Sequence, residues 1–434
     1  MARWWEKPGR LQWNEGRALE PGRWWVALGN IIPAVRAEMA GMPDEVMVKD
    51  DTLREGEEQP NHKPITNEMK VRLAHELEDA GINETEVGFP ATLESQYQLC
   101  KDLRKDGIKM RLSAHPRPMA EDWEKNLDKT VEAGVDVVYM LFPANDSDVF
   151  RFKGIREEHI TEDLCRHIYN SVKYAKSLGV IVRAGISTAG KAPLDRVAPI
   201  YKAIAEGGAD RAHVSDGYGC IIPENMKFYV RFIKSIVGPE VKIATHCHND
   251  YGLANANVIA AVTAGCEVID LSVNGLGDRA GIAALEVVVP ALEVLYGVDT
   301  GVNVEKMQYL SDFVEDLYGI RMQQHYPIVG DSMWVHEEDP HIVRCLLARE
   351  GGEAWAGYNI IRPEIFGAKE KLQFSLTSVH KGPGSCLAIK MRHMGVSATD
   401  EQFDELIARI LKISEEKHFA TEEEVEKLIN EIIA

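Results

Sequence analysis

The chain has 434 residues, of which 45% are hydrophobic, 27% charged and 7% aromatic. This length fits roughly three domains, or one large barrel with a smaller appendix, and either arrangement can bury a large core. Its formal net charge is −19, from 49 basic and 68 acidic residues, which disfavours binding to nucleic acid or to an anionic membrane. No apolar run approaches the roughly 20 residues of a membrane span, and the first residues lack the apolar segment of a signal peptide.

The seven cysteines are scattered along the chain, without a CxxC pair. This pattern argues against a disulfide scaffold or a cysteine-based zinc ribbon and favours a reducing compartment. We therefore expect a cytoplasmic protein whose partners include neither nucleic acid nor a membrane.

The first 45 residues differ in composition from the rest. They contain five of the eight tryptophans, which are Trp4, Trp5, Trp13, Trp24 and Trp25. Because exposed tryptophans seldom cluster on a soluble monomer, we expect residues 1–45 to form an arm that packs on its own chain or at a subunit interface.

From residue 46 onward, short β-branched runs alternate with helical patterns. Eight runs predict strands, at residues 46–49, 84–88, 109–112, 135–141, 180–183, 211–214, 241–245 and 268–272. Helical patterns between them include residues 67–80, 121–133 and 161–178. Several of the strands are almost continuously apolar, as expected for a parallel sheet that is covered on both faces.

Eight βα units over residues 46–295 match the size of a (β/α)8 barrel, that is, an α/β TIM barrel. A doubly wound open sheet is the competing architecture, but no GxGxxG sequence follows the first strand. After about residue 300 the strand pattern stops, and residues 303–349 and 400–434 have helical patterns. We therefore expect residues 296–434 to form a smaller, mainly helical C-terminal appendix.

The clearest chemical feature is His246-Cys247-His248, at the end of the seventh predicted strand. Residues i and i+2 of a strand face the same way, so the two imidazoles can bind one metal ion, whereas Cys247 should point into the packing. The C-terminal ends of barrel strands form the active-site face. The alternative is a pair of ordinary histidines that line the barrel mouth.

Two more loops follow strands at the same end of the barrel. After the first strand, Glu55 could supply a carboxylate to the metal and Arg54 could stabilise an oxyanion, although charged runs are often only solvated loops. After the eighth strand, the glycines of residues 274–281 could let the backbone approach a ligand, or could simply form a turn. Two histidines and one carboxylate leave positions on a divalent ion for oxygen donors.

Together these segments resemble the metal-dependent acyl-CoA condensing enzymes of the DRE-TIM group. That group includes isopropylmalate, homocitrate, citramalate and Re-type citrate synthases, with hydroxymethylglutaryl-CoA lyase as a relative. The resemblance rests on Asp50–Gly56, His246–Asp250 and Gly275–Arg279. It covers residues 46–295 well and the appendix loosely.

The resemblance implies an acyltransferase that joins acetyl-CoA, as co-substrate, to a 2-oxo acid in a Claisen condensation. A divalent ion (Mg, Mn, Zn or Co) would be bound by Glu55, His246 and His248, while Arg54 would polarise the 2-oxo group. The products would be free CoA and a 2-hydroxy dicarboxylic or tricarboxylic acid. The CoA side of the site would include Gly275, Gly277, Arg279 and Gly281.

In the appendix, His336 stands where the family has a histidine that enters the site of the partner subunit. The resemblance therefore implies a homodimer and makes His336 a candidate acid–base residue. Tyr358 is a candidate for a supporting role. The alternative for His336 is a surface histidine in an acidic stretch.

The chain departs from the family at several site positions. Glu58 replaces a glutamine, Gly217 a threonine and Ile282 a metal-binding asparagine, and Ser187 is not followed by the usual acid. Three other functions fit parts of the pattern: a lyase or aldolase, a non-haem iron oxygenase and a non-catalytic relative. The eight βα units disfavour the oxygenase.

Overall fold

A computed structural model describes residues 27–149, 152, 155–156, 159–351, 358–359 and 361–433. All five tryptophans of the expected N-terminal arm lie outside these residues. The chain divides into two units, and we describe each by itself. The barrel unit comprises residues 32–304 and 309–321, and the C-terminal unit comprises residues 305–308 and 322–433 together with 27–31.

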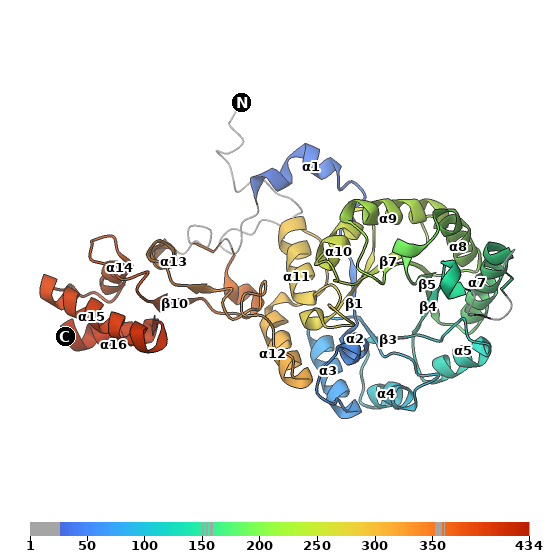
Figure 1. Ribbon diagram of the computed structural model, residues 1–434, viewed down its shortest axis with the longest axis horizontal. Coiled ribbons are helices and arrows are strands. Elements are labelled where there is room, and N and C mark those ends of the chain that lie inside the picture. Colours follow the sequence, from blue (N-terminus) through green and yellow to red (C-terminus); the bar gives the residue numbers. More distant parts are fainter. Residues whose placement is uncertain are drawn as a thin grey trace. The chain divides into compact units, whose positions relative to one another are not determined.

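Eight parallel strands close into a barrel in sequence order (Figure 1). They are β1 (Met47–Asp50), β2 (Glu84–Glu86), β3 (Arg111–Ala114), β4 (Val137–Phe142), β5 (Ile181–Ile186), β6 (Arg211–Asp216), β7 (Lys242–Cys247) and β8 (Val268–Leu271). The barrel is closed because the first strand, β1, pairs with β2 on one side and with the last strand, β8, on the other. The predicted (β/α)8 barrel is confirmed, and the open doubly wound sheet is excluded.

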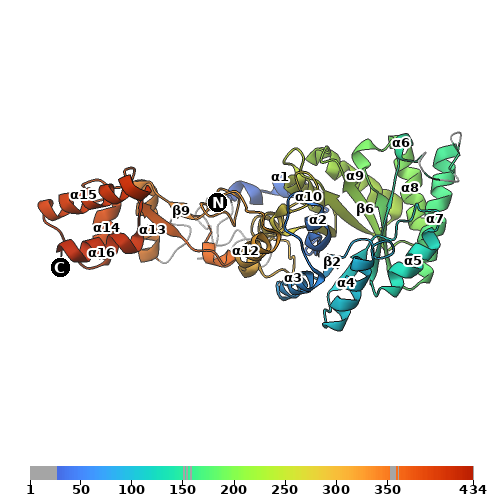
Figure 2. The same ribbon diagram turned by 60° about the horizontal axis from the view of Figure 1, so that its bottom comes forward.

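Helices surround the strands, as Figures 1 and 2 show. They are α2 (Thr52–Glu58), α3 (Asn67–Asp79), α4 (Glu94–Lys105), α5 (Trp123–Glu132), α6 (Asp146–Val149), α7 (Ile160–Ser177), α8 (Leu194–Glu206), α9 (Pro223–Val237), α10 (Ala254–Thr263) and α11 (Leu285–Pro290), with α1 (Pro33–Ala37) before β1. Several of the longer helices bury an apolar stripe. In α9, for example, Met226, Val230, Ile233 and Val237 recur at helical spacing and are buried.

The inside of the barrel contains paired charges as well as aliphatic side chains. Lys49, Arg183 and Asp270 are fully buried, and Arg183 donates from Nη1 and Nη2 to the two oxygens of Asp270, each over 2.7 Å. A buried charge is tolerated only when such partners compensate its lost hydration. These groups lie on β1, β5 and β8, so they connect strands across the barrel.

The C-terminal unit is mainly helical, with α13 (Asp339–Gly351), α14 (Cys386–His393), α15 (Asp400–Lys417) and α16 (Glu422–Ile433). A small sheet in the order β11 (Ala420–Thr421), β10 (Lys371–Phe374) and β9 (Val335–His336) was not predicted. The helical prediction for residues 303–349 is confirmed in α12 (Met307–Tyr318) and α13 but wrong between them. Helix α12 ends before Gly319 (φ 70°), and the non-helical segment that follows contains Pro327 and the left-handed Ile328 (φ 68°).

None of the helices in the described ranges is long and apolar enough to cross a membrane. The seven cysteines are free thiols. Cys247 is fully buried, and its Sγ lies 3.6 Å from Thr245 Oγ1, as expected for a side chain that points into the packing.

Candidate active site

Three side chains from two distant parts of the sequence meet at the C-terminal mouth of the barrel. Glu55 lies in α2, directly after β1, whereas His246 is on β7 and His248 follows it. Nε2 of His246 lies 3.4 Å from Oε1 of Glu55 and 3.3 Å from Nε2 of His248. All three residues are buried. The structure thus brings together the groups that the sequence singled out as metal ligands.

This donor set fits a divalent cation. Nδ1 of His246 lies 3.1 Å from Asp51 and 3.4 Å from Asp270, which keeps a proton on Nδ1 and turns Nε2 toward the other ligands. Nδ1 of His248 is buried and has no hydrogen-bond partner among the described residues. Two imidazole nitrogens that face each other beside a carboxylate are stabilised when a cation lies between them.

The charges around the two histidines also favour a bound cation. Burial and the neighbouring His246 lower the pKa of His248 to about 4, so His248 is a neutral ligand at pH 7. Burial lowers the pKa of His246, but hydrogen bonds to Asp270, Asp51 and Glu55 outweigh it and raise that pKa well above its ordinary value. An environment that attracts a proton so strongly to Nε2 attracts a cation for the same reason.

Arg54 is held beside the three donors. Its Nη1 lies 2.6 Å from Glu55, its Nε donates to Glu86 over 2.6 Å, and Glu58 accepts from Nη1 over 3.2 Å. Burial opposes the charge, but these carboxylates raise the pKa of Arg54, which stays a cation. A guanidinium fixed in this way can stabilise negative charge that develops on a bound oxygen.

A buried lysine connects the metal ligands to Arg54. Nζ of Lys49 bonds to the carboxylates of both Asp51 and Glu86. Asp51 in turn contacts His246, and Glu86 contacts Arg54. Sequence reasoning missed this network, although charged residues inside otherwise apolar strands were a visible sign of it.

The glycine-rich loop after β8 packs against Glu55. The backbone N–H of Asp278 donates to Oε2 of Glu55 over 3.3 Å, and a Cβ on Gly277 would lie 3.0 Å from that oxygen. Gly281 has φ 79°, and a Cβ there would collide with the carbonyl oxygen of Gly275 at 1.9 Å. Only glycine therefore fits at residue 281 in this loop.

Arg279 lies on the exposed rim of the same loop. Its Nε and Nη2 donate to the two oxygens of Asp250 over 2.7 and 2.9 Å, and Nη1 donates to Asp278 over 2.5 Å. These carboxylates neutralise the guanidinium. Any anion that it binds must therefore share it with Asp250 and Asp278.

A cavity of about 340 Å³ opens at this mouth, which is within the size range of small-molecule sites. It is lined by Arg54, Glu55, Glu58, Phe89, His115, Arg117, Pro118, Tyr139, Leu141, Ser187, Ser215, Gly217, His246 and His248. Two family departures have structural reasons. A Cβ on Gly217 would lie 2.8 Å from the carbonyl oxygen of Ser187, and Ile282 is buried in the loop packing.

The remaining predicted residues, His336 and Tyr358, belong to the C-terminal unit. His336 is buried, Nδ2 of Asn359 lies 2.9 Å from its Nε2, and its ring centroid lies 5.4 Å from that of Tyr358. His341, which sequence reasoning missed, stacks on Tyr358 at 3.8 Å, and its side chain is 29% exposed. The sign available in the sequence was a second histidine five residues after the first.

Comparison with known proteins places these features in a family context. Residues 45–314 match the model of the HMGL-like family. Homocitrate synthase AksA of Methanocaldococcus jannaschii is 32% identical over 389 residues, which are 90% of this chain and 91% of that protein. A protein assigned as an (R)-citramalate synthase in Archaeoglobus fulgidus is 34% identical over 390 residues, 90% of this chain and 76% of that protein.

Two further matches agree with these. The 2-isopropylmalate synthase of Methanocaldococcus jannaschii is 31% identical over 401 residues, 91% of this chain and 73% of that protein. The crystal structure of the HMG-CoA lyase of Bacillus subtilis matches with a TM-score of 0.53 and 22% identity, over 64% of this chain and 95% of that chain. The lyase match establishes the shared fold.

Proposed function

Because the chain belongs to the HMGL-like family, we propose that it joins acetyl-CoA to a 2-oxo acid and releases free CoA and a 2-hydroxy dicarboxylic or tricarboxylic acid. The relatives that align over most of both chains carry the names of homocitrate, citramalate and isopropylmalate synthases. The observation that carries the proposal is the convergence of Glu55, His246 and His248 beside Arg54.

Glu55, His246 and His248 would bind a divalent ion (Mg, Mn, Zn or Co), which supplies Lewis-acid polarisation of a bound oxo group. Arg54 donates to the oxo oxygen of the substrate and stabilises the negative charge that develops there. Its ion pairs with Glu86 and Glu58 keep the guanidinium oriented before the substrate arrives.

The reaction needs a base that removes a proton from the methyl group of acetyl-CoA. The resulting carbon nucleophile bonds to the oxo carbon, the oxo oxygen takes up a proton, and water then hydrolyses the thioester to release CoA. We assign the base to a group of side chains in the C-terminal unit of a second subunit in a homodimer, and this group includes His336 and Tyr358. His341 joins this group because its ring stacks on Tyr358 and is accessible to solvent.

The loop that contains Gly275, Gly277, Arg279 and Gly281 would lie on the CoA side of the site. Its glycines bring backbone N–H groups close to the mouth without intervening side chains. The free thiols of the chain suit a cytoplasmic enzyme.

The test is release of free thiol when acetyl-CoA is mixed with pyruvate, oxaloacetate, 2-oxoglutarate or 2-oxoisovalerate, with a divalent metal and again with a chelator. We expect metal-dependent release with at least one oxo acid, and a loss of about 100-fold or more in kcat in Glu55→Gln. Glu68→Gln makes the same chemical change at an exposed position in α3 and should leave the rate unchanged.

Absence of thiol release with all four oxo acids would contradict the proposal. Metal-dependent cleavage of a hydroxyacyl-CoA, measured in parallel, would identify the lyase alternative instead.

A further inference from the structure

A second cavity adjoins the site cavity on the side of β3, β4 and β5. Its volume is about 490 Å³, and it shares Arg117, Pro118, Leu141 and Ser187 with the first. Because the two cavities share these walls, they lie side by side at the mouth of the barrel.

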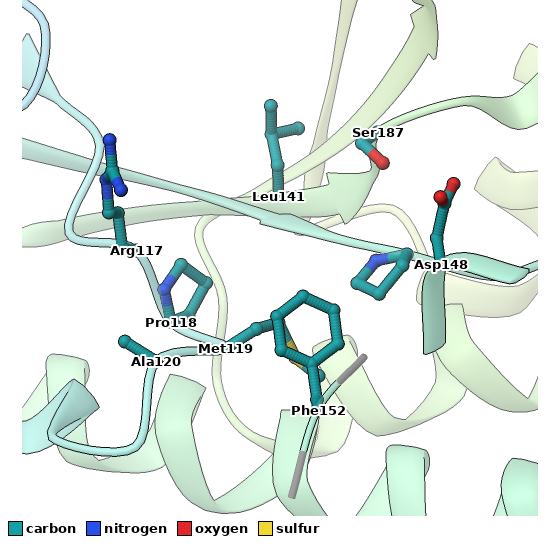
Figure 3. Close-up of a pocket in the computed structure, with 9 residues that line it drawn as sticks. Arg117, Pro118, Met119, Ala120, Leu141, Asp148, Phe152 and Ser187 are labelled. Atoms are coloured by element: carbon teal, nitrogen blue, oxygen red, sulfur yellow. The ribbon is translucent and has the colours of Figure 1, made fainter. Parts of the chain in front are cut away.

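The wall of the second cavity is mostly apolar, with charge at its two sides (Figure 3). Pro118, Met119 and Phe152 line its floor, Arg117 stands at one side, and Asp148 stands across from it. A substrate with only a short methyl or isopropyl side chain would leave this space unused. The apolar wall instead suits a chain of methylene groups.

The guanidinium of Arg117 is accessible to an anion in the cavity. It is exposed at the cavity, and its guanidinium lies over the Phe89 ring, with its carbon 5.2 Å from the ring centre. Within the part of the chain that the structure describes, no acidic side chain forms an ion pair with Arg117. The other arginines of the barrel mouth, Arg54 and Arg279, are each held by carboxylates.

The backbone also fixes the position of Arg117. Its φ of 52° is in the left-handed region, which is unfavourable for a residue with a side chain, and it stands between the buried Pro116 and Pro118. Across the cavity, Oδ2 of Asp148 accepts a hydrogen bond from Nδ2 of Asn145 over 2.8 Å. An incoming carboxylate therefore has its favourable partner at Arg117.

We infer that Arg117 determines substrate specificity by binding a second, terminal carboxylate, so that the preferred substrate is a 2-oxo dicarboxylic acid. The oxo end lies at Arg54 and the metal donors, the methylene groups pass Leu141 and Pro118, and the far carboxylate pairs with the guanidinium of Arg117. This inference rests on the proposed function.

The experiment compares substrates that have equal carbon number but differ in the terminal group. Metal-supplemented enzyme and acetyl-CoA are assayed for thiol release with 2-oxoadipate against 2-oxohexanoate, and with 2-oxoglutarate against 2-oxopentanoate. We expect the wild type to favour each dicarboxylate at least tenfold in kcat/KM. Arg117→Met should reduce that preference by about 10- to 100-fold, and Arg117→Lys should reduce it less.

Arg72→Met is the matched control. It removes an exposed guanidinium that also lies over an aromatic ring, that of Phe313 at 5.8 Å, but lines neither cavity. The inference is overturned if the wild type prefers the monocarboxylates, or if Arg117→Met lowers kcat/KM equally for the dicarboxylates and the monocarboxylates.

Calorimetry separates failure of this inference from failure of the proposed reaction. If no substrate releases thiol, the condensation itself is wrong. Binding of 2-oxoadipate in the presence of Mn²⁺ then still tests Arg117. At least tenfold weaker binding in Arg117→Met than in Arg72→Met supports the carboxylate site, and equal binding overturns it.

Discussion

Nδ1 of His246 lies 3.1 Å from Oδ2 of Asp51 inside the barrel, and both side chains are buried. This hydrogen bond sets which nitrogen of His246 carries the proton and which faces the other metal ligands. The orientation of a metal ligand thus depends on a residue that belongs to a different strand end and does not itself face the cavity.

Asp51→Asn is expected to weaken divalent metal binding about 10- to 100-fold, because an amide is a poorer acceptor for the Nδ1 proton and does not increase the basicity of Nε2. Competition with a chromophoric chelator measures the affinity. Asp106→Asn is the control, since it alters an exposed aspartate that contacts His75 far from any metal donor. Unchanged metal affinity in folded Asp51→Asn would mean that the pair has no role in binding.

Metal binding is expected to stabilise the barrel unit. A ligand at 100 times its Kd stabilises the native state by about 2.7 kcal/mol, so Mn²⁺ or Zn²⁺ should raise the Tm of the wild type and a chelator should lower it. In His248→Ala the metal should leave the Tm unchanged, because one donor of the site is gone. His75→Ala, at an exposed position, should keep the full response. Equal responses in all three proteins would place the metal elsewhere.

The sequence predicted those functional groups and strands that can be recognised from neighbouring residues in the chain. His246 and His248 share a strand end, and the eight apolar runs define the barrel, so the metal donors could be inferred without coordinates. The role of Lys49 could not be inferred in this way, because it depends on Glu86 and Asp270, which contact Lys49 from other strands. The partner of a buried charge is set by strand register and barrel closure, which leave no short-range pattern in the sequence.

The same limit applies in the C-terminal unit. The stacking of His341 on Tyr358 joins α13 to a segment that follows it by several residues, and β9 to β11 are too short to be recognised from alternation. The resemblance drew attention to His336 alone, and only the structure showed that His336 is the more buried of the two histidines.

His341→Gln and His336→Gln are expected to behave differently. His341 is accessible and stacked on Tyr358, so its loss should lower kcat about 100-fold or more with little change in Tm. His336 is buried and bonded to Asn359, so its replacement should lower the free energy of unfolding by about 1–3 kcal/mol. Measurements of kcat and Tm for both variants test which of the two histidines acts in catalysis. A large loss of kcat at unchanged Tm in His336→Gln would assign the base to His336.

Glu286 gives the barrel unit a pH-dependent stability. Burial raises the pKa of this carboxyl from 4.5 to about 7, although the backbone N–H of Asn274 donates to it over 2.9 Å. The folded state therefore holds a proton that the unfolded state releases, and ionisation opposes folding. Relative to Glu286→Gln, the wild type should lose about 3 kcal/mol of stability as the pH rises from 4.5 to above 7.

Urea unfolding of both proteins at pH 5 and pH 8 measures this difference. Because glutamine keeps an oxygen for the Asn274 N–H and cannot ionise, the variant should be close to the wild type at pH 5 and more stable than it at pH 8. Glu267, whose carboxylate is paired with Lys234 over 3.0 Å, offers a control in which Glu267→Gln gives no such gain at pH 8. A constant difference between wild type and Glu286→Gln at both pH values would show that Glu286 does not change its charge on folding.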